Sequence, residues 1–487
     1  MDWREEYNRR LASAEEAMGL VEDGDLVSVP IAGPRVLPRA LVKRAEDLDR
    51  VELRLGNPLA DPGYLKAEAK QTFGLEFELF IGDFSRFTMD EGRATYLPNL
   101  FSLSYNDHDA EHHRTADVFL TAVTPPDDDG YVQFGAHNWN KRSYVRNSRK
   151  TIAEVDPGLR PVRGDNKVHV TEIDRFVEIP ALKITREMVD AWLRRVDDDA
   201  LRAEYEAIVD ELTNLDRLIL IGPALVRYAP LQVRRLLGLA EPPEVARTIA
   251  GYVSELVPDG ACIQIGAGEP SQYLVRCGTF DNKTDLGLHT EMVAPGIAKL
   301  VDGGVITGKN KAVHPGVAVA SAWSGSDEED LAIVTDNPAF EAYDPEYVLD
   351  ITRMSQNPSV HSMNNALSVD LVGQINAETV FGSRMINGTG GQPEVHISAC
   401  LSKGGRAITL LPSTAMDGAV SRIVPALDQG AFVTIPRYFA DTIVTEYGVA
   451  RLWGKNHRER AEELIAVAHP DHRAELRAQA QSVLASV

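Results

Sequence analysis

Glu291 is a carboxylate set between polar Thr290 and apolar Met292, in the segment DLGLHTEMVAP. A charged side chain beside apolar residues is costly unless it is paired or has a function. A glutamate carboxylate can act as a nucleophile and form a covalent intermediate. The local residues alone favour a simpler interpretation, a glutamate at a helix start, where the N-terminal dipole stabilises negative charge. Both interpretations stay open at this point.

Two glycine-rich stretches could present backbone N–H groups to a ligand. The first, Gly266-Ala267-Gly268-Glu269-Pro270, directly follows an apolar run, as a strand feeding a tight turn would. Glycines let a ligand approach the backbone, and the N–H groups can then bind a phosphate or an oxyanion. A tight turn without a ligand is the alternative. A dinucleotide fingerprint would need a third glycine where Ser271 stands.

The second stretch, INGTGGQ, contains Gly388, Gly390 and Gly391. It predicts either a β-turn or a second set of backbone N–H groups that faces the first glycine loop. Further on, Lys403 and Arg406 flank a Gly-Gly pair before an apolar run. That pattern suits either a phosphate contact or a solvated hairpin.

Metal and thiol chemistry find little support in the sequence. His108 and His112 are four residues apart, with His113 beside them, but no matching third ligand pattern is visible, so we expect surface histidines. The three cysteines form no CxxC pair, which leaves zinc and thioredoxin-like sites without support. We therefore expect neither a metal nor a permanently bound cofactor.

The composition is that of a globular protein with ordinary surface chemistry. The 487 residues are 44% hydrophobic and 25% charged, which at about 100–200 residues per domain suggests two or three domains. A net charge of −22 offers no basic excess for a nucleic-acid partner. No apolar run approaches the roughly 20 residues that span a bilayer, and the first residues are charged. With few, unpaired cysteines, a cytoplasmic location is expected.

Helical and strand-like segments alternate along the chain, which predicts an α/β fold around largely parallel sheets. An amphipathic helix is expected over 5–20, and a second helix over 243–256. Strands are expected at 26–30, 51–55, 118–123 and 261–265, and a strand edge within 285–295. Later apolar runs at 331–334, 407–411 and 432–435 each stop at turn residues, as in a second α/β domain.

These segments together resemble the acetyl-CoA hydrolase/transferase family, which includes 4-hydroxybutyrate, succinate and acetate CoA-transferases. The similarity runs in order through nearly the whole second half and parts of the first. The matching segments are MDWREEY, TPPDDDGYVQFG, VHVTEIDRFVE, IQIGAG, DLGLHTEM, VDGGVITGKNKAVHPG, SMNNALSVDLVGQINAE, INGTGGQ, LSKGGRAITLLPSTA, SRIVP, VTEYGVARLWGK and ERAEELIAVAHPDHR.

The resemblance implies two CoA-transferase-type (NagB/RpiA-like) α/β domains, over 1–184 and 241–487, with the active site between them. Residues 185–240, rich in charged helical patterns, are expected to be a helical insertion. The resemblance places the catalytic glutamate at Glu291. It places the oxyanion and CoA contacts at Gly266, Ala267, Gly268, Glu269, Pro270, Asn364, Gly388, Gly390, Gly391 and Lys403.

Two departures from the family pattern bear on acyl specificity. Where relatives read GIGGIP, this chain has Glu269 before Pro270, which adds a second carboxylate near the acyl site. Where relatives read Val-Asp-Phe after Gly-Gly-Gln, this chain reads Pro393-Glu394-Val395. Neither departure removes the proposed nucleophile. Arg384 and His289 are further candidates for the acyl pocket.

The resemblance implies ping-pong transfer of CoA from an acyl-CoA to a carboxylic acid through a glutamyl-CoA thioester on Glu291. Acyl-CoA and small carboxylic acids are the expected partners, and coenzyme A is a substrate. A homo-oligomer, dimer or tetramer, is expected. An acyl-CoA hydrolase that uses the same glutamate is the alternative, and a non-catalytic CoA-binding protein is a second one. The sequence does not name the two acids.

Overall fold

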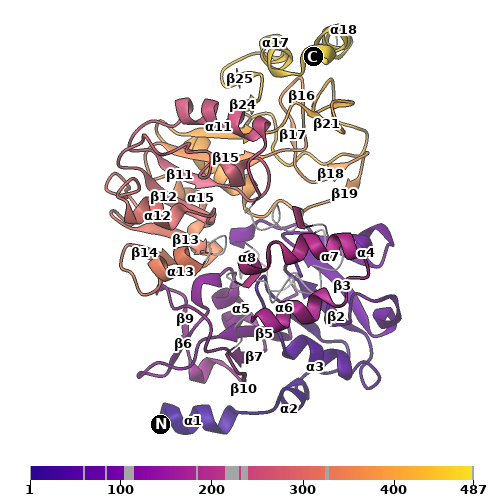
Figure 1. The fold of residues 1–487 in the computed structure, drawn as a ribbon, viewed down its shortest axis with the longest axis vertical. Helices are drawn as coiled ribbons and strands as arrows, with labels where there is room; N and C mark the ends of the chain where they lie inside the picture. Colours follow the sequence, from indigo (N-terminus) through magenta and orange to yellow (C-terminus); the bar gives the residue numbers. More distant parts are fainter. Residues whose placement is uncertain are drawn as a thin grey trace. The chain divides into compact units, whose positions relative to one another are not determined.

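The computed structural model describes residues 2–58, 61–82, 85–103, 114–181, 185–213, 230–231, 240–323 and 328–484. The predicted surface histidines 108, 112 and 113 lie outside these residues. The chain divides into two compact units, Met1–Leu237 with Ser321–Glu346, and Gly238–Ala320 with Tyr347–Val487 (Figure 1). The domain boundaries expected at residues 184 and 240 remain a prediction.

The first unit is built on a seven-stranded sheet in the order β10-β7-β5-β1-β2-β3-β4, with every neighbouring pair parallel. All six residues of β5 are buried, as expected where helices cover both faces of a parallel sheet. The strands are β1 Leu26–Val29, β2 Val51–Leu55, β3 Phe73–Glu78, β4 Ala94–Leu97, β5 Val118–Val123, β7 Lys150–Val155 and β10 Arg175–Glu178.

The strands expected at 26–30, 51–55 and 118–123 are confirmed, but the single helix expected over 5–20 is wrong. That segment forms two helices because Ser13 begins a new one, in a reciprocal capping box with Glu16. Of the helical insertion expected over 185–240, the described residues 185–213 contain three helices, and that the segment is an insertion stays a prediction. The helices are α1 Trp3–Arg10, α2 Ala14–Met18, α3 Leu37–Lys43, α4 Arg86–Asp90, α5 Lys141–Asn147, α6 Arg186–Leu193, α7 Asp199–Glu206 and α8 Val209–Thr213.

Smaller pairings complete this unit. Strand β6 Tyr131–Gln133 pairs with β9 Lys167–His169, and β8 Arg163–Gly164 pairs with β14 Phe340–Ala342. The apolar run at 331–334 lies in a helix, α13 Glu328–Val334. Among the described residues, no helix is long and apolar enough to cross a membrane.

The second unit has a sheet that runs β25-β24-β20-β15-β11-β12. The strands from β24 to β12 are mutually parallel, and β25 is antiparallel to β24. Its strands are β11 Cys262–Ile265, β12 Gly287–Met292, β13 Ala318–Ala322, β15 Val360–Asn365, β20 Arg406–Leu410, β24 Thr442–Thr445 and β25 Gly448–Arg451. The strands expected at 261–265 and within 285–295 are thereby confirmed, and the apolar run at 407–411 overlaps β20.

The helices of this unit are α11 Glu244–Leu256, α12 Ile297–Asp302, α14 Pro345–Val348, α15 Ile351–Met354, α16 Gln392–Leu401, α17 His457–Val467 and α18 Arg473–Leu484. Short strands form side ribbons: β16 Ser368–Asp370, β17 Ile375–Asn376, β18 Thr379–Val380, β19 Arg384–Met385, β21 Thr414–Ala415, β22 Val420–Ser421 and β23 Ile423–Val424. The run at 432–435 forms no strand, and only Ile435 makes an isolated bridge, to Ile375.

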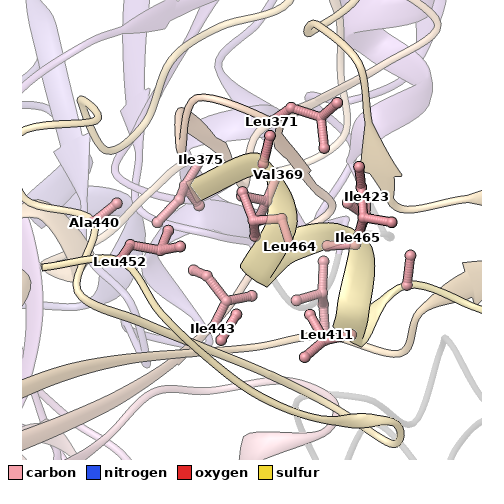
Figure 2. Packing of buried hydrophobic residues seen from close by; sticks show 14 of the residues in the cluster. Val369, Leu371, Ile375, Leu411, Ile423, Ala440, Ile443, Leu452, Leu464 and Ile465 are labelled. Carbon is pink, nitrogen blue, oxygen red and sulfur yellow. The ribbon is translucent and has the colours of Figure 1, made fainter. Parts of the chain in front are cut away.

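A buried apolar cluster packs α17 against the strands of the second unit (Figure 2). Leu464 of α17 is fully buried, as are Val369 of β16, Ile423 of β23 and Ile443 of β24. Burying one such side chain stabilises a fold by about 1.5–3 kcal/mol relative to leaving it exposed. This core fixes the sheet from which the candidate site extends.

Candidate active site

The carboxyl ends of the parallel strands in the second unit bring together segments that are far apart in the sequence. From β11 the chain proceeds to β12 on one side, whereas β15 and then β20 lie on the other side. The strand order therefore reverses between β11 and β15. In open α/β sheets, ligands bind outside the carboxyl ends of the strands at such a point. The Gly266–Pro270 loop follows β11 here, and Asn364 and Asn365 end β15.

Glu291 lies in strand β12, one residue before its end, so the helix-start interpretation is wrong. The register pairs Cys262 with Gly287 and Ile263 with Leu288, so β11 and β12 are parallel neighbours whose carboxyl ends lie at the same end of the sheet. Neighbouring strands lie about 4.8 Å apart. The nucleophile candidate is therefore on the strand adjacent to the one that leads into the first glycine loop.

The Glu291 carboxylate reaches the second glycine stretch, 100 residues further along the chain. The backbone N–H of Gly391 donates to Oε2 of Glu291 at 2.7 Å. Gly391 is the N-cap of α16, so the carboxylate faces the positive end of a helix. A Cβ at position 391 would stand 2.5 Å from Oε2 of Glu291 and 2.5 Å from Cδ1 of Leu349. Only glycine allows this approach.

Opposing effects set the charge of this carboxylate. Desolvation raises the pKa of Glu291 to about 8, the Gly391 hydrogen bond lowers it, and the neighbouring charge of Glu394 raises it. Glu394 lies in the first turn of α16 and is fully buried. Glu291 itself stays partly exposed, so solvent offsets part of the desolvation. A carboxylate poised in this way is a candidate for a functional site.

If Glu291 must be ionised to react, kcat/KM should rise with pH through the pKa of this group. We expect Glu394→Gln to move this acidic limb to lower pH, because it removes a negative charge that disfavours the carboxylate. Steady-state rates between pH 5.5 and 9.5 measure the shift. Glu378→Gln is the control, since Glu378 is a half-buried carboxyl bonded to Thr434 and does not act on Glu291. An unmoved limb in Glu394→Gln would refute this coupling.

The first glycine loop is held by hydrogen bonds to the end of β15. A Cβ at Gly266 would meet Oδ1 of Asn364 at 2.4 Å, and Gly268 has φ +88°, so both positions favour glycine. Asn365 donates to the carbonyl of Ala267 at 2.7 Å and accepts from the N–H of Ser271 at 3.0 Å. These hydrogen bonds therefore hold the backbone of the loop in one conformation.

Comparison with known proteins decides the family. Sequence models described as the acetyl-CoA hydrolase/transferase N-terminal and C-terminal domains match residues 1–186 and 328–480. The chain is 33% identical to a 4-hydroxybutyrate coenzyme A transferase of Clostridium kluyveri, over 98% of each chain. It is 30% identical to a succinyl-CoA:cyclohexane-1-carboxylate CoA transferase of Geobacter metallireducens, over 97% of this chain and 95% of the relative.

The chain belongs to the acetyl-CoA hydrolase/transferase family. Its structure is also similar to the crystal structure of RipA from Yersinia pestis, with a TM-score of 0.78 and 27% identity, covering 99% of each chain. The family recognised in the sequence, the α/β fold and the prediction of a CoA-transferase enzyme are confirmed.

Within this family member, the structure brings several of the predicted site residues together. Gly391 contacts Glu291, Gly390 (φ +53°) and Gly388 lie in the turn that leads into α16, and Gly266–Pro270 border the adjacent strand. Glu269 is exposed, and its carboxylate accepts from the hydroxyl of Tyr273 at 2.7 Å.

Other predicted residues lie apart from this group. Lys403 follows α16 and precedes β20, so it stands at the amino end of the sheet, opposite the edge that carries Glu291. His289 is fully buried, and its Nε2 lies 2.7 Å from the carbonyl of Val348. Arg384 is exposed on the short strand β19. Among the described residues, no cluster suited to a metal ion is present.

Sequence reasoning chose Asn364 and missed Asn365. The Asn364 side chain is buried and donates to Oε1 of Gln264 at 2.9 Å, whereas Asn365 holds the glycine loop. Asn364 also lies against the loop, since a Cβ at Gly266 would stand 2.4 Å from its Oδ1, and its role as a CoA contact stays a prediction. Gln392 was also missed as a site residue, and Glu394 was noted only as a departure from the family pattern; their signal is their place at the end of the second glycine stretch.

Proposed function

We propose that the protein transfers CoA from an acyl-CoA to a carboxylic acid through a covalent glutamyl-CoA thioester on Glu291. The observation that carries this proposal is the 2.7 Å hydrogen bond from the Gly391 N–H to Oε2 of Glu291. It puts a backbone donor on the carboxyl group whose carbon must become tetrahedral. Coenzyme A is a substrate here, and the loop at Gly266–Pro270 is the proposed place for its binding.

In the first half-reaction, a carboxylate oxygen of Glu291 attacks the thioester carbonyl of the donor. The carbon–sulfur bond breaks, which leaves a mixed acyl-glutamyl anhydride and the CoA thiolate. The thiolate then attacks the glutamyl carbonyl. The donor acid departs as a carboxylate, and Glu291 is left joined to sulfur as a thioester.

The attack of the CoA thiolate on the glutamyl carbonyl is the step in which we propose that the Gly391 N–H acts. When the thiolate attacks the glutamyl carbon, the negative charge develops on the glutamyl oxygen. A donor 2.7–3.1 Å from that oxygen stabilises the oxyanion, and removing one such donor typically costs about 10²–10³ in rate. The Gly391 N–H already lies at 2.7 Å from a Glu291 carboxyl oxygen. The positive end of α16 acts in the same direction.

In the second half-reaction, the acceptor carboxylate attacks the glutamyl thioester and expels the CoA thiolate. The thiolate then attacks the acyl carbonyl of the new anhydride, which releases the new acyl-CoA and regenerates the Glu291 carboxylate. Protons and electrons balance without an oxidant or a reductant, because the thioester is exchanged and its energy is kept.

A mass-spectrometric panel tests the proposal. Wild-type protein mixed with an acyl-CoA alone should carry CoA on the peptide that contains Glu291. Pairing several acyl-CoAs with 4-hydroxybutyrate, succinate, acetate and cyclohexane-1-carboxylate should then identify the acids. A CoA adduct on a different peptide would contradict the assignment. Rapid thiol release from acyl-CoA with no acid present would favour the hydrolase, in which water reaches the same thioester.

A homo-oligomer, dimer or tetramer, is also part of the proposal, by likeness to the family. Light scattering coupled to gel filtration measures the mass in solution. A monomer at micromolar concentration would contradict it.

A further inference from the structure

Asn365 is the last residue of β15, and its backbone is fixed in the centre of the sheet. It pairs with Leu410 of β20, and the N–H of the next residue, Ala366, donates to the carbonyl of Leu410 at 3.1 Å. A side chain carried by a central strand is held more rigidly than one carried by a loop. Asn365 is therefore held rigidly at the carboxyl end of the central strands, the end of the sheet at which Glu291 also lies.

From this point the Asn365 side chain holds the first glycine turn. Its Nδ2 donates to the carbonyl of Ala267 at 2.7 Å and to Oγ of Ser271 at 2.8 Å, while its Oδ1 accepts from the N–H of Ser271 at 3.0 Å. The Ser271 hydroxyl lies 2.6 Å from the carbonyl of Gly266 and 3.1 Å from that of Gly268. One amide thus joins both ends of the turn.

The backbone of the same residue holds the second glycine turn. Nε2 of Gln392 donates to the carbonyl of Asn365 at 3.0 Å. Gln392 is the first residue of α16 and directly follows Gly391, whose N–H bonds to Glu291. Asn365 is therefore attached on one side to the loop after β11 and on the other to the donor that contacts Glu291.

We propose that Asn365 is a positioning residue that sets the distance between the proposed CoA-binding turn and the nucleophile, acting on the nucleophile through Gln392. The inference rests on the proposed function. The two turns belong to connections about 120 residues apart in the chain, and each must be in place when sulfur meets the glutamyl carbon. A misplacement of 1 Å far from the chemistry can cost about 10²-fold in rate.

Two substitutions cut this linkage on opposite sides. Gln392→Met keeps the length of the side chain and removes the donor to Asn365, but leaves the first turn intact. We expect it to slow single-turnover formation of the Glu291 thioester 10- to 100-fold, with CoA affinity within twofold of wild type. Asn365→Ala releases the first turn. It should slow the same step and also weaken CoA binding.

The double variant tests whether both act through one linkage. Its loss should be clearly smaller than the product of the two single losses, since either change already breaks the chain of contacts. Asn456→Ala is the matched control: Asn456 caps α17 by accepting from the N–H groups of Arg458 and Glu459, and an alanine at such a cap costs about 0.5–2 kcal/mol. It should lower the thermal midpoint and leave the single-turnover rate of the folded protein unchanged.

Wild-type rates in Gln392→Met, or single losses that multiply fully in the double variant, would overturn the positioning role. These outcomes differ from failure of the proposed function. If the proposed function is wrong, wild-type protein itself forms no thioester on Glu291, and the inference about Asn365 is then wrong as well.

Discussion

Glu291→Gln should lower the rate of CoA transfer by at least about 10⁴-fold, by analogy with the loss of a covalent nucleophile in other enzymes. The amide keeps the shape of the side chain, and its oxygen can still accept the hydrogen bond from Gly391. It cannot attack a thioester as a carboxylate does. Steady-state transfer assays and the mass of the Glu291 peptide after incubation with acyl-CoA measure the loss.

The same variant has a second readout that reports on folding. Because the folded pKa of Glu291 is raised to about 8, ionising it in the folded protein costs stability. This cost is absent below the unfolded pKa, near 4.3, and grows as pH rises towards 8. Glu291→Gln removes the charge, so its thermal midpoint should exceed that of wild type at pH 8.5 and match it near pH 4.5.

Glu475→Gln is the control for these measurements, since Glu475 is an exposed residue in the first turn of α18. It should leave the rate unchanged, and any small shift of the thermal midpoint, from the loss of a charge at the start of α18, should be the same at pH 4.5 and pH 8.5. Transfer activity of Glu291→Gln within tenfold of wild type would exclude Glu291 as the nucleophile.

Gly391→Ala should have the second-largest effect, a loss of about 10²–10³ in kcat. The added methyl would stand 2.5 Å from Oε2 of Glu291 and 2.5 Å from Cδ1 of Leu349. Contacts that short force the carboxylate or the turn to move, which breaks the hydrogen bond that positions the reacting carbon. Burst-phase kinetics of thioester formation separate this loss from changes in CoA binding.

Gly251→Ala is the matched control for this glycine. Gly251 lies inside α11, and a methyl there would meet nothing within 4 Å. Alanine in a helix interior stabilises the folded protein by about 0.5–1 kcal/mol relative to glycine. The thermal midpoint of Gly251→Ala should therefore rise slightly, and its kcat should not change. A fully active Gly391→Ala would show that transfer does not depend on the close approach of a glycine backbone to Glu291.

The sequence by itself determined the family, the α/β class and the positions of most strands that carry the site. These features depend on local patterns: apolar runs that stop at turns, and segments that match relatives in order. Glu291 entered as the nucleophile only through the resemblance, because its immediate neighbours favoured a helix start. The helix expected over 5–20 failed for a local reason, the Ser13 cap.

Only the tertiary structure decided which residues meet. A parallel sheet gathers the carboxyl ends of its strands at one end, so Glu291 and the loop at 266–270 lie at the same end of the sheet while Lys403 lies at the opposite end. The Gly391 contact spans 100 residues, and the contact of Asn365 with Ala267 spans 98 residues. Strand order and register decide which residues meet in space and which way each side chain points. Local propensity and spacing along the chain do not encode strand order or register.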